Sequence, residues 1–132
     1  MAGPPERGVV ALDTNAVHDY YAAAGVRGSK AALIARAFED DLVVLPPPVL
    51  SEVLSDPMTS DKSARIRALP LLEVIDGYWT RAGRLRAAIL AQGYRAFLAD
   101  CLIAQVCIDH DVPLITYDRD FSRFVSAGLK LI

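Results

Sequence analysis

The chain has 132 residues, 53% of them hydrophobic, and a formal net charge of −2 at pH 7. This length suits one domain with a single core, and this composition excludes a disordered chain. The charge gives no overall basic signal for nucleic acid, no apolar run approaches the roughly 18 residues of a membrane span, and the first residues lack the apolar segment of a signal peptide.

The bulk properties therefore predict a cytoplasmic protein with no membrane association. We expect residues 1–7 to form a flexible N-terminal arm and residues 8–132 to form a single domain. Cys101 and Cys107 are expected on one helix, about 9 Å apart along its axis, which is too far for a disulfide. A reducing compartment is consistent with this spacing.

Short apolar runs, rich in β-branched residues, alternate along the chain with longer segments of helical pattern. The expected strands are residues 9–12, 42–45, 71–75, 113–116 and 129–132. The expected helices are residues 15–23, 29–41, 47–55, 60–69, 78–93, 96–111 and 119–128. Continuous apolar runs are typical of buried parallel strands, so the sequence predicts an α/β domain with a mainly parallel, five-stranded sheet flanked by helices.

Acidic residues follow two of these expected strands. Asp13 comes directly after residues 9–12, and Asp118 lies two residues beyond 113–116, with Asp120 close by. Ligands of such sheets bind at the C-terminal edge of the strands. Each acid taken alone also has a simpler explanation as a helix cap or turn residue, and we expect Asp120 to be a cap.

Two further acids lie in apolar helical segments. Asp100 stands in FLADCLIAQVCI with no Lys or Arg three or four residues away, and Glu52 stands in PPPVLSEVLS without a cation at those positions. An ionised carboxylate in a buried helix costs several kcal/mol unless it is paired or bound to a metal. A cap at Asp100 and a plain surface position for Glu52 stay open as alternatives.

Carboxylates that share one apolar pocket repel one another and raise each other's pKa. A divalent cation removes that repulsion, and oxygen-only ligands favour Mg²⁺ or Mn²⁺. The two histidines have no ligand-spaced partners, so a zinc site is not indicated. The sequence therefore predicts that Asp13, Glu52, Asp100 and Asp118 meet around a hard cation.

Four segments in this order resemble the motifs of the PIN-domain nuclease family, and especially the VapC-like toxins of bacterial toxin–antitoxin pairs. They are VVALDTNAV, PPPVLSEVL, FLADCLIAQVC and VPLITYDRDF, and the resemblance runs from about Val9 to Ile132. It implies a PIN-like, Rossmann-like three-layer domain. It also implies a metal-dependent endoribonuclease with an RNA substrate, a cognate antitoxin protein as partner, and a homodimer.

The resemblance also assigns roles to particular residues. Asp13, Asp100 and Asp118 would ligate Mg²⁺ or Mn²⁺, and Glu52 would ligate or act through water. The supporting residues beside these acids would be Thr14, Asn15, Thr116 and Asp120. Arg81, Arg84, Arg86 and Arg119 would contact RNA phosphates, although a solvated helix face explains the first three as well.

The sequence leaves alternatives open. Ala96 stands where relatives often carry a polar or acidic residue, so one or two metal ions are both compatible with the motifs. A phospho-accepting receiver-like domain shares the alternation of strands and helices and the acid after the first strand, but it leaves Glu52 and Asp100 unexplained. The other alternative is a non-catalytic PIN-like module that binds or regulates a partner.

Overall fold

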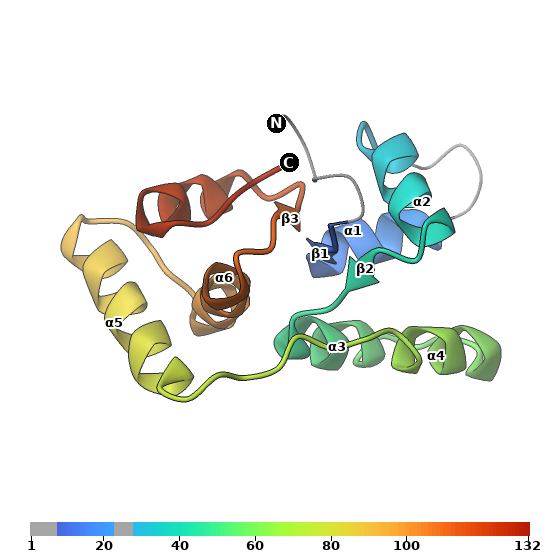
Figure 1. The fold of residues 1–132 in the computed structure, drawn as a ribbon, viewed down its shortest axis with the longest axis horizontal. Coiled ribbons are helices and arrows are strands. Elements are labelled where there is room, and N and C mark those ends of the chain that lie inside the picture. Colours follow the sequence, from blue (N-terminus) through green and yellow to red (C-terminus); the bar gives the residue numbers. More distant parts are fainter. Residues whose placement is uncertain (1–7, 23–27) are drawn as a thin grey trace.

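A computed structural model describes residues 8–22 and 28–132 (Figure 1). The predicted arm, residues 1–7, lies outside the described residues. A parallel sheet contains β1 (Val10–Leu12), β2 (Val43–Val44) and β3 (Leu114–Ile115) in the order β2-β1-β3. All residues of β1 are fully buried between its two neighbours, as expected for an apolar central strand.

Helices flank the sheet, with α5 and α6 on one side of it and α2 on the other (Figure 1). The helices are α1 (Thr14–Tyr20), α2 (Ala31–Glu39), α3 (Pro47–Leu54), α4 (Ser60–Arg67), α5 (Tyr78–Ala91), α6 (Leu98–His110) and the 3₁₀ helix η1 (Arg119–Ala127). Each lies in a segment that the sequence predicted as helical. The α/β class with a parallel sheet between helices is therefore confirmed.

The predicted five-stranded sheet is wrong in its strand count, because the described residues form three strands. The run 71–75 adds one parallel bridge, between Leu71 and Leu45, and the run 129–132 adds one between Leu131 and Leu114. Both bridges are parallel and lie at the edges of the sheet, Leu71 beside the end of β2 and Leu131 beside β3. Beyond Leu72 the first run is exposed, and little apolar burial remains to stabilise a longer ladder.

The core consists mainly of the strands and the buried faces of α1, α3 and α6. Helix α6 contacts α3, α5 and η1, which explains why its sequence carries apolar residues almost all round. Cys101 and Cys107 are both buried on this helix as free thiols. Among the described residues, no helix combines the length and the apolar character needed to cross a bilayer.

Candidate active site

Asp13 lies where β1 passes into α1, at the C-terminal edge of the sheet. Its Oδ1 accepts a hydrogen bond from the Thr14 amide (2.8 Å) as the N-cap of α1, and its Oδ2 accepts one from the Thr116 hydroxyl (2.7 Å). Burial raises the pKa of Asp13, the two hydrogen bonds lower it, and the charges of Glu52 and Asp118 raise it further. The acid thus has a cap role and also belongs to a group of interacting carboxylates.

Thr116 joins the ends of the two strands. Besides donating to Asp13, its hydroxyl accepts a hydrogen bond from the Asp118 amide (3.0 Å) and one from Asn15 Nδ2 (3.4 Å). The Asn15 Oδ1 in turn accepts from the Tyr117 amide (3.1 Å). The predicted supporting residues Asn15 and Thr116 therefore meet beside Asp13 and fix the start of the segment that carries Asp118.

Glu52 reaches the same place from α3. Its Oε1 accepts a hydrogen bond from the hydroxyl of Thr14, the residue that follows Asp13 (2.8 Å). Glu52 is exposed, as its surface alternative expects, but its carboxylate is turned toward α1 rather than left in solvent. The third predicted supporting residue, Thr14, thus links two of the four acids.

Asp100 is the third residue of α6, which begins at Leu98. The alternative that Asp100 caps this helix is therefore wrong. Burial raises its pKa to about 6, and the charges of the other three candidate acids and of Asp120 add to the shift. These electrostatic interactions connect Asp100 to carboxylates from β1, α3 and the residues after β3.

Asp118, and not Asp120, is the N-cap of η1. Its Oδ1 accepts a hydrogen bond from the Asp120 amide (2.9 Å), so the predicted cap role of Asp120 is wrong. Asp120 lies in the first turn and pairs with Arg123 (3.4 Å). The second oxygen of Asp118 is free of hydrogen bonds to other described residues, which leaves it available to a ligand.

The donor chemistry of the four acids suits a hard divalent cation, because every donor is a carboxylate oxygen. Among residues 8–22 and 28–132, however, no three His, Cys, Asp or Glu side chains are arranged so that they could hold a metal ion together. Hydrogen bonds occupy both oxygens of Asp13 and one oxygen each of Glu52 and Asp118. The charges of Glu52 and Asp118 help to raise the pKa of both Asp13 and Asp100, but the present positions of the four acids do not complete a ligand shell.

The four predicted phosphate-binding arginines differ in what their guanidinium groups already contact. Arg81 makes two hydrogen bonds to the carboxylate of Asp109 (3.0 and 2.7 Å), and Arg86 donates to the backbone carbonyl of Ala96 (2.8 Å). Arg84 and Arg119 are exposed and make no hydrogen bond or ion pair to another described residue. Of the four, Arg119 is the one that lies next to a candidate acid in the chain.

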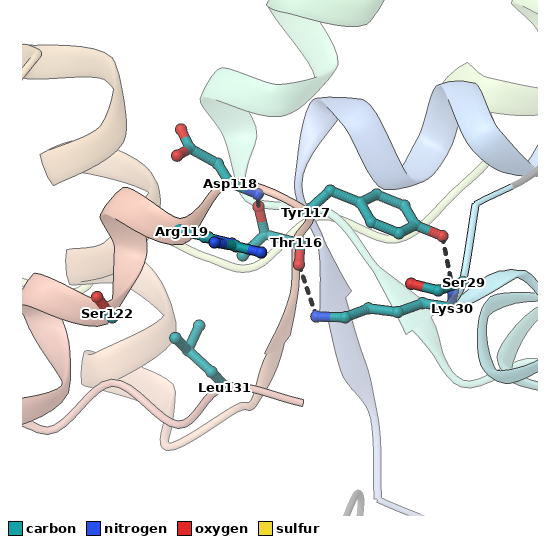
Figure 2. Close-up of a pocket in the computed structure, with 8 residues that line it drawn as sticks. All are labelled: Ser29, Lys30, Thr116, Tyr117, Asp118, Arg119, Ser122 and Leu131. Atoms are coloured by element: carbon teal, nitrogen blue, oxygen red, sulfur yellow. Dashed lines mark hydrogen bonds between the residues drawn. The ribbon is translucent and has the colours of Figure 1, made fainter.

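A cavity of about 600 Å³ adjoins the acids on the side of Asp118 (Figure 2). Its lining comprises Ser29, Lys30, Thr116, Tyr117, Asp118, Arg119, Ser122 and Leu131. The Lys30 ammonium donates to the carbonyls of Thr116 (2.7 Å) and Ile132 (2.8 Å). Sequence reasoning missed Ser29, Lys30, Tyr117, Ser122 and Leu131; the contacts of Lys30 join residues 86 and 102 positions apart and leave no local signal.

The chain was compared with known families and structures. The family described as PIN domain matches residues 10–126. The fold is similar to VapBC2 from Rickettsia felis, solved with a DNA fragment from their promoter (20% identity, TM-score 0.70, 94% of this chain and 97% of that chain covered). It is also similar to VapBC-5, a member of the VapBC family of toxin-antitoxin systems from Mycobacterium tuberculosis (25%, 0.65, 95% and 98%). No curated protein sequence matches the chain.

Proposed function

The chain belongs to the PIN domain family, and from this membership we propose that it is a metal-dependent endoribonuclease and the toxin of a toxin–antitoxin pair. PIN domains are generally nucleases, so a hydrolase that acts on nucleic acid is the activity expected of the family. The resemblance found in the four sequence motifs is confirmed at the family level. Two parts of the proposal go beyond the family: that the substrate is RNA, and that the enzyme cuts at internal positions of the RNA strand.

The observation that carries the proposal is the placement of Asp13, Glu52, Asp100 and Asp118 close enough that the charges of the other three help burial to raise the pKa of Asp100. Four acids from separate parts of the chain interact at one edge of the sheet. Such mutual repulsion disfavours folding unless the charges serve a ligand. Helix capping accounts for Asp13 and Asp118 but accounts for neither Asp100 nor Glu52.

We propose that Asp13, Asp100 and Asp118 hold Mg²⁺ or Mn²⁺ and that Glu52 acts directly or through water. When bound, such an ion lowers the pKa of a coordinated water and stabilises negative charge on a phosphodiester. The chain itself positions the acids: Thr116 fixes the carboxylate of Asp13, and Thr14 turns Glu52 toward it. Asp100 must lose its proton before it can serve as a ligand.

The partners are proposed from the similar structures. The VapBC-5 structure is described as a member of the VapBC family of toxin-antitoxin systems, and the VapBC2 structure includes a DNA fragment from its promoter. We propose a cognate antitoxin protein for this chain, together with a homodimer and a cytoplasmic location. The receiver-like alternative has no support in the family match, whereas a non-catalytic PIN-like module remains the second candidate to be tested.

A cleavage assay tests the enzymatic proposal. Purified protein is incubated with a panel of labelled RNAs in Mg²⁺, Mn²⁺ or EDTA, beside the variants Asp13→Asn and Asp100→Asn. Asp61→Asn is the matched control, because Asp61 is an exposed acid of α4 that pairs with Arg65 (3.3 Å). The proposal expects metal-dependent cleavage by the wild type and the control, and none by the two site variants.

The toxin role has a separate test in cells. Expression of the chain should arrest growth, expression of Asp100→Asn should not, and co-expression of the adjacent open reading frame should relieve the arrest. If every RNA stays intact while the chain still binds an antitoxin, the non-catalytic module is the correct description.

A further inference from the structure

We propose that the cavity beside Asp118 is a binding site for the nucleotide that adjoins the scissile phosphate in a single-stranded RNA, with Arg119 as the phosphate-binding group. This inference rests on the proposed ribonuclease function and extends it to the position of the substrate. We call this cavity the Arg119 pocket, defined by Ser29, Lys30, Thr116, Tyr117, Asp118, Arg119, Ser122 and Leu131.

The location of the Arg119 pocket gives the first argument. Thr116 and Asp118 line the pocket and also belong to the acidic site, since Thr116 binds the carboxylate of Asp13. A polynucleotide whose scissile phosphate lies at the acids must continue on at least one side of them. Figure 2 shows the Asp118 carboxylate on one side of the segment Thr116–Arg119 and Lys30 and Leu131 on the other, so a strand that reaches both must pass Arg119.

The size and lining suit a nucleotide. About 600 Å³ lies within the 300–1,000 Å³ common for small-molecule sites. Ser29 and Ser122 place hydroxyl groups in the lining, and neither side chain forms a hydrogen bond with another described residue. Leu131 contributes a half-exposed apolar surface on which a sugar or a base can rest. Hydroxyl groups around an apolar wall match a ribose, whose own hydroxyl groups surround a carbon ring.

Charge gives the third argument. Arg119 is exposed and without an ion pair among the described residues, so its fork of N–H donors is available for two phosphate oxygens. Arg81, by contrast, is already held by Asp109, and Arg86 by the carbonyl of Ala96. Lys30 adds a second positive charge to the lining, although two carbonyls hold its ammonium group in place.

Single-stranded RNA fits this pocket better than a duplex does. A concave site takes a nucleotide that has been splayed out of a stack, and such nucleotides occur in loops and single strands. An acidic peptide would also meet Arg119, and the acids repel carboxylates and phosphates alike, but the hydroxyl groups of Ser29 and Ser122 beside the apolar Leu131 suit a ribose better than an acidic side chain. RNA is therefore the occupant to which the proposal commits, and a peptide is an outcome of the test.

The test separates RNA binding from cleavage. Binding of a short, labelled single-stranded RNA is measured by fluorescence anisotropy in EDTA, and cleavage of the same RNA is measured in Mg²⁺. Arg119→Gln should weaken binding roughly tenfold, and Arg119→Lys should restore part of the loss. The slope of log affinity against log salt should fall by about 0.7, which corresponds to one phosphate contact on a single strand.

Two further variants sharpen the result. Arg36→Gln is the matched control, because Arg36 is an exposed arginine on α2 (80% exposed side chain) whose pair, Asp40, is one helical turn away. Ser122→Phe keeps every charge and fills the pocket, so it should weaken RNA binding as Arg119→Gln does. In cleavage, both pocket variants should raise KM while kcat stays near the wild-type value. Circular dichroism and Tm confirm that each variant is folded.

Each outcome decides between the two proposals. If the wild type cleaves RNA and both pocket variants match Arg36→Gln in affinity and KM, the pocket assignment is wrong and the ribonuclease function stands. If the wild type binds RNA through Arg119 but cleaves none, the ribonuclease function fails, and the pocket is an RNA-binding site without a scissile phosphate beside it. If the pocket variants keep their RNA affinity but lose antitoxin binding, the pocket is a protein-docking site and the proposal is overturned.

Discussion

The hydroxyl of Thr116 donates a hydrogen bond to Oδ2 of Asp13 at 2.7 Å, although the two residues are 103 positions apart in the chain. Both side chains are buried, and each follows a strand of the same parallel pair, β1 and β3. The sheet register therefore fixes the distance between them. This bond makes the position of the first acid a property of the fold rather than of a flexible side chain.

Replacement of Thr116 by valine should damage both stability and activity. The change leaves the amide of Asp118 without its partner and Oδ2 of Asp13 with only the longer bond from Asn15 Nδ2 (3.4 Å), which should lower the free energy of unfolding by about 1–3 kcal/mol. We expect kcat/KM for RNA to fall about tenfold or more, because a misplaced acid weakens transition-state stabilisation. Urea denaturation and cleavage kinetics measure the two effects. Thr116→Ser keeps the hydroxyl and should recover most of both; equal loss in the two variants would contradict a role for the hydrogen bond.

Asp100→Asn should stabilise the metal-free protein at neutral pH while it abolishes cleavage. The folded protein holds the pKa of Asp100 at about 6, against 3.8 for an ordinary aspartate, so the charged form opposes folding above pH 6. Because Asp100 is only partly buried, solvent screening reduces the gain to about 1 kcal/mol, or roughly 3–5 °C in Tm. Calorimetry in EDTA measures it.

The pH dependence of this stabilisation follows from its sign. As pH falls from 6 toward 3.8, the wild type takes up its proton in the folded state first and gains stability, so its difference from Asp100→Asn should shrink and vanish. Asp61→Asn should show no such pH-dependent gain. A difference between Asp100→Asn and the wild type that stays constant from pH 4 to pH 8 would remove the electrostatic explanation.

The rate of RNA cleavage should fall as the pH is lowered, and the pH at which half of the rate is lost should depend on the Mg²⁺ concentration. At low Mg²⁺ the midpoint should lie near pH 6, because a protonated Asp100 cannot serve as a ligand. At high Mg²⁺ the metal competes with the proton, and the midpoint should move to lower pH. Cleavage rates across a grid of pH and Mg²⁺ test this coupling; a midpoint indifferent to Mg²⁺ would show that Asp100 does not exchange its proton for the metal.

Lys30→Met should destabilise the fold more than its charge alone suggests. The Lys30 ammonium ties α2 to the carbonyls of Thr116 and Ile132, and the loss of these charged hydrogen bonds should cost about 1–3 kcal/mol. Lys130→Met is the matched control, because its pair with Asp111 is well exposed (60% and 74%) and contributes about 1 kcal/mol at most. Denaturation curves compare the two; equal shifts would refute the structural role of Lys30.

The sequence predicted the acids through chemistry that is visible locally. Asp100 has apolar neighbours and no cation one helical turn away, so the sequence indicated that its carboxylate serves a ligand together with other acids. The raised pKa of Asp100 agrees with that environment. Asp13 and Asp118 could be placed because each follows an apolar strand, and parallel strands end at one edge. Their cap roles were equally visible, and the structure shows that each acid has one.

Other features depend on distances that local patterns do not encode. The run 71–75 has the composition of a strand, but most of it is exposed, so only Leu71 pairs with the sheet. The Arg119 pocket depends on Lys30 reaching Thr116 and Ile132, which lie 86 and 102 positions away. Periodicity describes which face of an element is buried; it does not state which distant backbone carbonyl a lysine will bind.

Asp13 is both the N-cap of α1 and a carboxylate of the candidate active site, and a single substitution can separate the two roles. Asparagine caps helices as well as aspartate does, and its amide oxygen can keep the bond from the Thr14 amide, while its nitrogen gives up the bond that Thr116 donates to Oδ2. An Asp13→Asn chain should consequently keep the start of α1 and lose the carboxylate that the proposed metal needs. Under the proposed pairing with an antitoxin, an inactive form made in the same cell would occupy that antitoxin and leave active copies unrestrained, so a disabling mutation would increase growth arrest.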